Sequence, residues 1–134
     1  MRKVLILASV CVALVGRTAF AEQVVLDLHD YDDDLMKTLD QTIKYFEPDI
    51  TAGNARGSAE DAEILQEAFK WMENYFTKKG NADDAVKIAQ NGQVLIAAAM
   101  KSMAEKNLDA AGDSARDLAR TCRSCHDIYK PLKK

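Results

Sequence analysis

The chain has 134 residues, 18 of them basic and 21 acidic, with a hydrophobic fraction of 48%. This length suits one domain whose core needs no disulfide bonds, and the net charge of −3 argues against a nucleic-acid-binding protein, which would carry a basic surface. No apolar run reaches the roughly 18 residues that a membrane-spanning helix needs, so no span is expected.

The N-terminal segment has the pattern of a secretory signal peptide. Two basic residues are followed by a 12-residue apolar run at 4–15 and by an Ala-Phe-Ala sequence ending at Ala21. We therefore predict a signal peptide over residues 1–21 and one mature domain over 22–134. Cleavage removes three basic residues and no acidic residue, so the net charge falls from −3 to −6.

Apolar residues then recur at helical spacing in four successive stretches, and none alternates as a strand would. The first stretch covers roughly 27–46 and is expected to stop at Pro48, because proline disrupts a helix interior. Residues 48–57 are predicted to form the longest connection in the chain. The second helix should begin at Ser58, with an aspartate three residues on as a variant of the capping box, and end at Gly80.

The third helix is predicted to follow Asn81 as its N-cap and to end near Asn107, with Gly92 as a weak point in its middle. The fourth is predicted over 109–130 and ends before Pro131. Four amphipathic helices with short connections predict an all-α fold, an antiparallel four-helix bundle of the kind that builds cofactor sites between facing helices.

A Cys-x-x-Cys-His sequence lies near the end of the fourth helix. This pattern attaches c-type haem: Cys122 and Cys125 would bond the haem vinyl groups, and His126 would be the proximal iron ligand. The three positions fall on one face of a helix, as the chemistry requires. A redox-active cysteine pair would instead need a βαβ setting, and a zinc site would need four ligands.

Together with the signal peptide and the four helices, the Cys-Arg-Ser-Cys-His-Asp-Ile-Tyr-Lys sequence at 122–130 resembles the cytochrome c-prime superfamily. Tyr129 and Lys130 match the aromatic and basic residues that follow the motif in that family. The resemblance implies one covalent haem c, a periplasmic location and frequent homodimers. We expect no enzymatic activity. The family's arginine before the distal residue has no counterpart here, because residues 30–34 are strongly acidic.

The resemblance also implies that the other face of the iron decides the function. In a low-spin branch of the family, a methionine of the first helix closes the site, and Met36 is the candidate here. His29 is a rival ligand. If the site is open, Leu35 and Leu39 would form its distal wall, and the protein would bind nitric oxide and carbon monoxide.

We therefore expect a periplasmic one-electron carrier that serves a redox partner protein, with His126 and Met36 on the iron. The alternatives are a gas-binding protein with an open site, a catalytic haem protein that uses His29 as a distal acid–base group, and a haem-free helical bundle that binds other proteins. Trp71 is expected to be a half-buried aromatic residue, and the aspartates at 30–34 could dock a basic partner. Three methionines are expected to be core packing: Met72, Met100 and Met103.

Overall fold

The computed structural model describes residues 26, 28 and 30–129, and in this part of the chain all regular structure is helical. The four helices are α1 (Asp33–Thr51), α2 (Ala55–Lys79), α3 (Asp83–Ala104) and α4 (Leu108–Tyr129). The predicted signal peptide at 1–21, the rival ligand His29 and the matching Lys130 lie outside the described residues.

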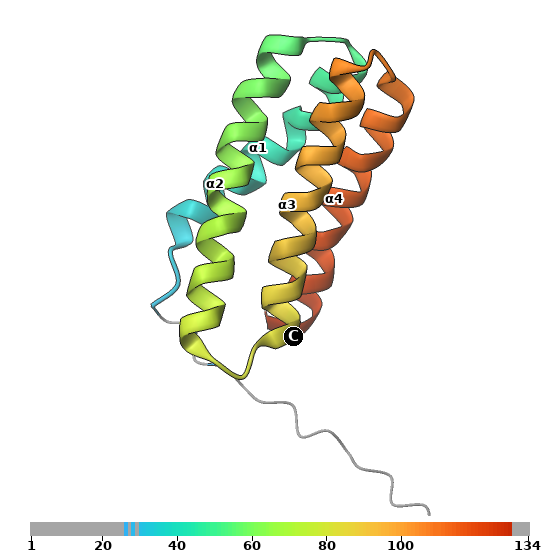
Figure 1. The fold of residues 1–134 in the computed structure, drawn as a ribbon. Coiled ribbons are helices and arrows are strands. Elements are labelled where there is room, and N and C mark those ends of the chain that lie inside the picture. The colour runs from blue at the N-terminus through green and yellow to red at the C-terminus, as the bar shows by residue number, and fades with distance from the viewer. Residues whose placement is uncertain (1–25, 27, 29, 130–134) are drawn as a thin grey trace, which may run out of the picture.

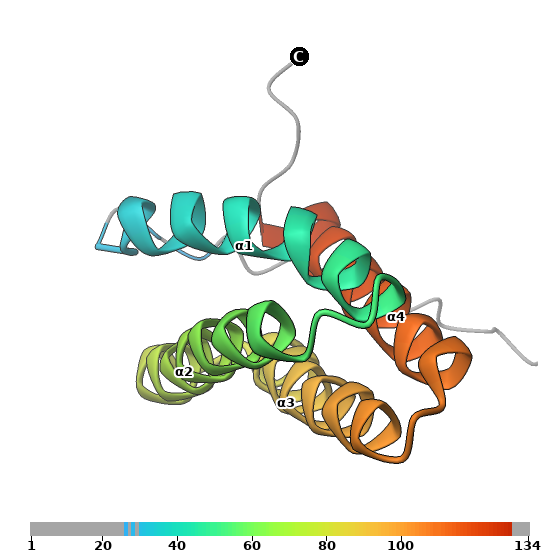
Figure 2. The same ribbon diagram turned by 90° about the horizontal axis from the view of Figure 1, so that it is seen from above.

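The helices form a four-helix bundle in which neighbours along the chain pack against each other and α1 closes the ring against α4 (Figures 1 and 2). Each connection has three residues, which forces successive helices to run antiparallel. The all-α bundle predicted from periodicity is confirmed. The prediction that the first connection is the longest is wrong.

Pro48 does not stop the first helix, which continues to Thr51. Proline removes the backbone hydrogen bond to the Lys44 carbonyl, but Lys44 and Pro48 are both exposed, so water can reach that carbonyl. Ile50, two residues further on, is fully buried, and this apolar burial favours the extra turn. Residues 48–51 are therefore helical, and the connection is correspondingly short.

The second helix begins at Ala55, three residues before the predicted start at Ser58. Asn54 is the N-cap, and its side-chain oxygen accepts a hydrogen bond from the Gly57 amide at 3.1 Å. The Ser58 hydroxyl is fully buried and donates to the Asn54 carbonyl at 2.8 Å. The predicted capping box is therefore wrong, because Ser58 already lies inside the helix.

Asn81 is not the N-cap of α3, which is Ala82 without a side-chain cap. Gly80 and Asn81 both take positive φ, 72° and 54°, so together they reverse the chain between α2 and α3. The predicted end of α2 at Gly80 is confirmed, and α4 begins and ends within one residue of its predicted bounds.

Gly92 is a place of close helix packing rather than a weak point in α3. It is buried, and a methyl group at this position would overlap the ring of Phe69 on α2. Glycine costs helix stability, but here it lets two backbones approach around an aromatic ring. Phe69 also lines the cavity of the candidate site described below.

Candidate functional site

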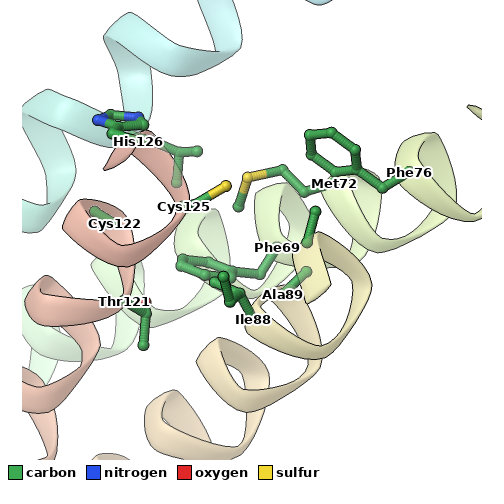
Figure 3. Close-up of a pocket in the computed structure, with 11 residues that line it drawn as sticks. Phe69, Met72, Phe76, Ile88, Ala89, Thr121, Cys122, Cys125 and His126 are labelled. Atoms are coloured by element: carbon green, nitrogen blue, oxygen red, sulfur yellow. The ribbon is translucent and has the colours of Figure 1, made fainter. Parts of the chain in front are cut away.

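The Cys-x-x-Cys-His sequence lies in the last two turns of α4, at the end of the bundle where α1 begins and α2 ends. Cys122, Cys125 and His126 are all half-buried. Both cysteines are free thiols. Figure 3 shows the sulfur of Cys125 pointing toward Met72 of α2, so this face of α4 looks into the bundle.

An inner cavity of about 30 Å³ lies beside the two thiols. All four helices contribute to its wall, and apart from Thr121 and His126 the lining side chains are apolar or thiols. Phe69 and Met72 close it from α2, and Leu39 closes it from α1. A concave, mostly apolar site with few polar groups is typical of cofactor binding.

A second, outer cavity of about 210 Å³ lies next to the first, and both are lined by Phe76, Cys125 and His126. Met36 of α1 and Tyr129 of α4 also line the outer cavity. The fold therefore brings Met36, which is 90 residues away in the sequence, to the cavity that His126 borders. The two predicted axial residues thus share one cavity.

The site raises the pKa of both thiols. Burial raises the pKa of Cys122 and, together with the nearby Cys122 thiol, raises the pKa of Cys125 to about 11. Redox-active cysteine pairs have the opposite shift and lie at helix N-termini. This pair lies near a helix C-terminus, and the described residues contain no strand, so it does not resemble a thioredoxin-like motif.

Five aromatic rings form a cluster beside the outer cavity, and three of them, Tyr31, Phe76 and Tyr129, line it. The sequence did not reveal these rings as a group. Tyr31 packs edge-on against Trp71 and Tyr75, with ring centroids 5.0 and 4.9 Å apart, and Trp71 stacks on Tyr75 at 5.2 Å. Phe76 joins this cluster to Tyr129 at 5.3 Å. The Trp71–Tyr75 spacing of four residues on α2 was a visible signal, but Tyr31 precedes α1 and has no helical register.

Three hydrogen bonds fix the edges of this aromatic cluster. The Tyr129 hydroxyl donates a short hydrogen bond to Asp84 and so ties the end of α4 to the start of α3. Asp30 accepts hydrogen bonds from the Tyr75 hydroxyl at 2.6 Å and from the Lys79 ammonium at 2.8 Å. Long-range contacts therefore hold the end of α4 and the segment before α1, both of which border the outer cavity.

The other residues singled out from the sequence have different positions. Met72 is buried as predicted, but it lines the inner cavity with both thiols, so its sulfur is a second thioether near His126. Met100 and Met103 are half-buried against the core, as expected. Leu39 lines the inner cavity, whereas Leu35 is half-buried against the core and lines neither of the two cavities. Trp71 is half-buried, as predicted.

Comparison with known protein families, with curated proteins and with solved structures finds no match to this chain. The family resemblance therefore stays a prediction that depends on the motif and on the order of elements. Among the described residues, no group of three or more His, Cys, Asp or Glu side chains is placed to hold a metal ion, and no helix is long and apolar enough to cross a membrane.

The donor set nevertheless fits covalent haem. Two free thiols and an imidazole lie on one helix face, they border an apolar cavity, and a thioether lies on the wall of the adjoining cavity. Thiols, imidazole and thioether are the groups by which c-type cytochromes hold and ligate haem iron.

Proposed function

We propose that this protein is a periplasmic monohaem c-type cytochrome that carries single electrons, with Cys122 and Cys125 as attachment points, His126 as proximal ligand and Met36 as distal ligand. One observation supports the proposal above the others: the Cys-x-x-Cys-His face of α4 borders two adjoining cavities, one of which Met36 also lines. When bound, the haem iron would supply reversible one-electron oxidation and reduction.

The chain's own residues would then do four things. The two thiols would anchor the group to one helix, and the His126 imidazole and Met36 thioether would be the protein ligands of its iron. A methionine ligand favours a higher reduction potential than a second histidine does. The apolar walls from Phe69, Met72 and Phe76 would exclude water, and the close-packed bundle would limit movement between oxidation states.

Attachment is tested by producing the full chain together with haem-attachment machinery in a periplasm. We expect a coloured protein whose haem stays with the chain after denaturation and whose mass matches cleavage before Glu22. Cys122→Ser combined with Cys125→Ser should lose the covalent haem. A colourless wild-type protein would overturn the proposal and favour a haem-free bundle that binds other proteins.

The distal ligand is tested by three matched methionine-to-leucine variants, because leucine keeps the volume and removes only the thioether. In the ferric wild type we expect a low-spin spectrum with a sulfur-to-iron band, and in the ferrous form no response to carbon monoxide. Met36→Leu should abolish the band and admit carbon monoxide. Met72→Leu tests the second thioether of the site, and Met100→Leu, which lies outside both cavity linings, is the control.

Two results would revise the assignment. Loss of the band in Met72→Leu, but not in Met36→Leu, would transfer the distal role to Met72. A high-spin wild type that binds carbon monoxide would favour a gas-binding protein with an open site, in which Met36 is packing.

A further inference from the structure

The chain immediately before α1 passes along the outer cavity. We call residues 30–32 the strap. Tyr31, at its centre, lines the cavity together with Met36 and His126, and its ring lies against Trp71, Tyr75 and Phe76. The strap is therefore a wall of the candidate site as well as the entry to α1.

One side chain fastens the strap to α2. A single carboxylate oxygen of Asp30 accepts both hydrogen bonds, from the Tyr75 hydroxyl and from the Lys79 ammonium. Tyr75 and Lys79 are four residues apart on α2, so they present neighbouring donors on one helix face. The Lys79 side chain is only 22% exposed, and its ammonium also lies over the Tyr75 ring, 5.7 Å from the centroid. This geometry holds the carboxylate in one place.

The other end of the strap is built into the first turn of α1. The Asp32 side chain accepts hydrogen bonds from the amides of Asp34 and Leu35, both at 3.0 Å, and its carbonyl accepts from the Met36 amide at 3.3 Å. Only the Tyr31 residue separates the Asp30 fastening from this cap. Movement at Asp30 would therefore shift both the Tyr31 wall and the turn that carries Met36.

We propose that Asp30 is a positioning residue: by binding Tyr75 and Lys79 it holds the strap against α2 and thereby keeps Met36 at the cavity that His126 borders. The inference deepens the proposed function and depends on it. It assigns the aspartate-rich segment a role within the molecule, in addition to the helix start that its composition predicts.

The test compares Lys79→Met with Lys37→Met. Lys79 pairs with Asp30 across the strap, whereas Lys37 pairs with Asp34 within α1 at the same end of the bundle, so both variants remove one cation from one ion pair. Asp30→Ala and the conservative Lys79→Arg complete the set. The first readout is amide hydrogen exchange over residues 30–36, and the second is the fraction of haem-loaded protein that lacks the sulfur-to-iron band.

Lys79→Met and Asp30→Ala should each raise the amide exchange rate of the strap about fivefold, and the fraction of protein that lacks the band should rise by the same factor. This factor is at the upper end of the effect expected from losing one partly exposed ion pair. Lys37→Met and Lys79→Arg should stay near wild type. Equal effects of Lys79→Met and Lys37→Met would overturn the inference. So would faster exchange with an unchanged band, because the strap would then be held without positioning the ligand.

These failures are distinct from failure of the proposed function. A haem-loaded protein whose sulfur-to-iron band does not respond to Lys79→Met overturns only the role of Asp30. A wild-type protein without covalent haem, or without the sulfur-to-iron band, overturns the ligand assignment of the proposed function. The positioning role of Asp30 then falls as well, whatever the hydrogen-exchange rates of the strap are.

Discussion

The two ends of the bundle differ in how completely they are packed. At the end where α1 meets α2 and α3 meets α4, Phe46, Ile50, Ala99 and Ala111 are fully buried, and even the Ser58 hydroxyl is enclosed. At the other end Cys122, Cys125, His126, Met36 and Tyr129 are only half-buried, and two cavities lie among them.

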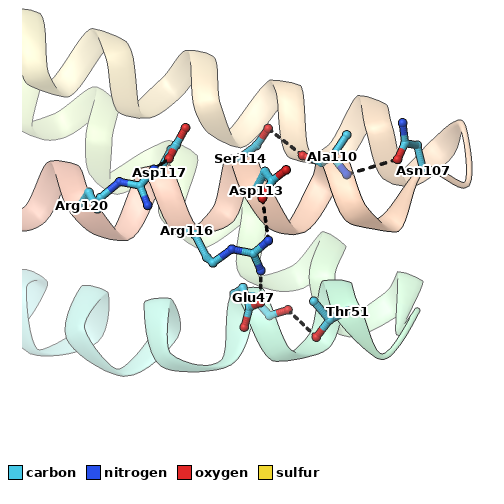
Figure 4. Close-up of polar contacts among 9 residues, drawn as sticks. All are labelled: Glu47, Thr51, Asn107, Ala110, Asp113, Ser114, Arg116, Asp117 and Arg120. Atoms are coloured by element: carbon cyan, nitrogen blue, oxygen red, sulfur yellow. Dashed lines mark hydrogen bonds and ion pairs between the residues drawn. The ribbon is translucent and has the colours of Figure 1, made fainter.

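Polar side-chain contacts join neighbouring segments at both ends of the bundle. At the packed end, Arg116 of α4 donates hydrogen bonds to Glu47 of α1 and to Asp113 of its own helix, both at 2.7 Å (Figure 4). Asn107 caps α4 by accepting from the Ala110 amide at 3.2 Å. The difference between the ends therefore lies in side-chain packing, and it predicts that the two ends respond differently to substitution.

The largest expected effect is at the packed end. Phe46→Ala should lower the free energy of unfolding by about 3–5 kcal/mol, because it removes the contacts of a fully buried ring and opens a void in the core. Phe76→Ala is the matched variant at the site end, where the ring borders two cavities and neighbouring side chains have room to relax into the space it leaves. Denaturant unfolding should rank Phe46→Ala as the more harmful. The reverse order would contradict the contrast between the ends.

Gly92→Ala tests the close packing of α2 against α3, because the added methyl group would overlap the Phe69 ring. We expect a loss of about 1–3 kcal/mol from overpacking, although alanine favours helices by about 1 kcal/mol over glycine. Thermal unfolding measures the loss. Combining Gly92→Ala with Phe69→Leu should restore part of the stability. If Gly92→Ala alone stabilised the protein, α2 and α3 would separate easily at this position.

Arg116→Ala should cost about 0.5–1 kcal/mol, since it breaks a partly exposed contact between α1 and α4. Arg120→Ala is the control, because Arg120 pairs with Asp117 within α4. A double-mutant cycle with Glu47→Ala, measured by urea unfolding, isolates the coupling energy between Arg116 and Glu47. A coupling energy of zero would mean that packing alone joins α1 to α4 at this end.

The smallest effect is a pH dependence at the site end. The Lys79 ammonium and the Tyr75 hydroxyl lower the pKa of Asp30 from 3.8 to about 2. A carboxyl group with a depressed folded-state pKa stabilises the fold above its unfolded-state pKa, and this stability is lost as pH falls from about 4 toward 2.

Hydrogen exchange over residues 30–36 should therefore accelerate as pH falls from about 4 to about 2, after correction for intrinsic rates. Asp30→Asn removes the ionisable group and should remove that part of the acceleration, while exchange in α3 should follow the same course in both proteins. An unchanged pH profile in Asp30→Asn would show that another group controls the strap.

Much of this architecture could be read from periodicity. The stripe of Leu65, Phe69, Met72 and Phe76 is buried as its spacing predicts. Helix ends were less predictable, because they depend on competition between local signals and burial. Pro48 was expected to stop α1, but burial of Ile50 extends the helix past it.

The sequence by itself determined four helices and a Cys-x-x-Cys-His face near the end of the last, since both follow from local spacing on an α-helix. Only the tertiary structure decided which residues meet that face. Met36 and Met72 have the same side chain, and their neighbours in sequence do not reveal that the first borders the outer cavity and the second the inner one. The fastening of Asp30 to Tyr75 and Lys79 spans 45 and 49 residues, so no local pattern encodes it, and only packing of the helices brings those groups together.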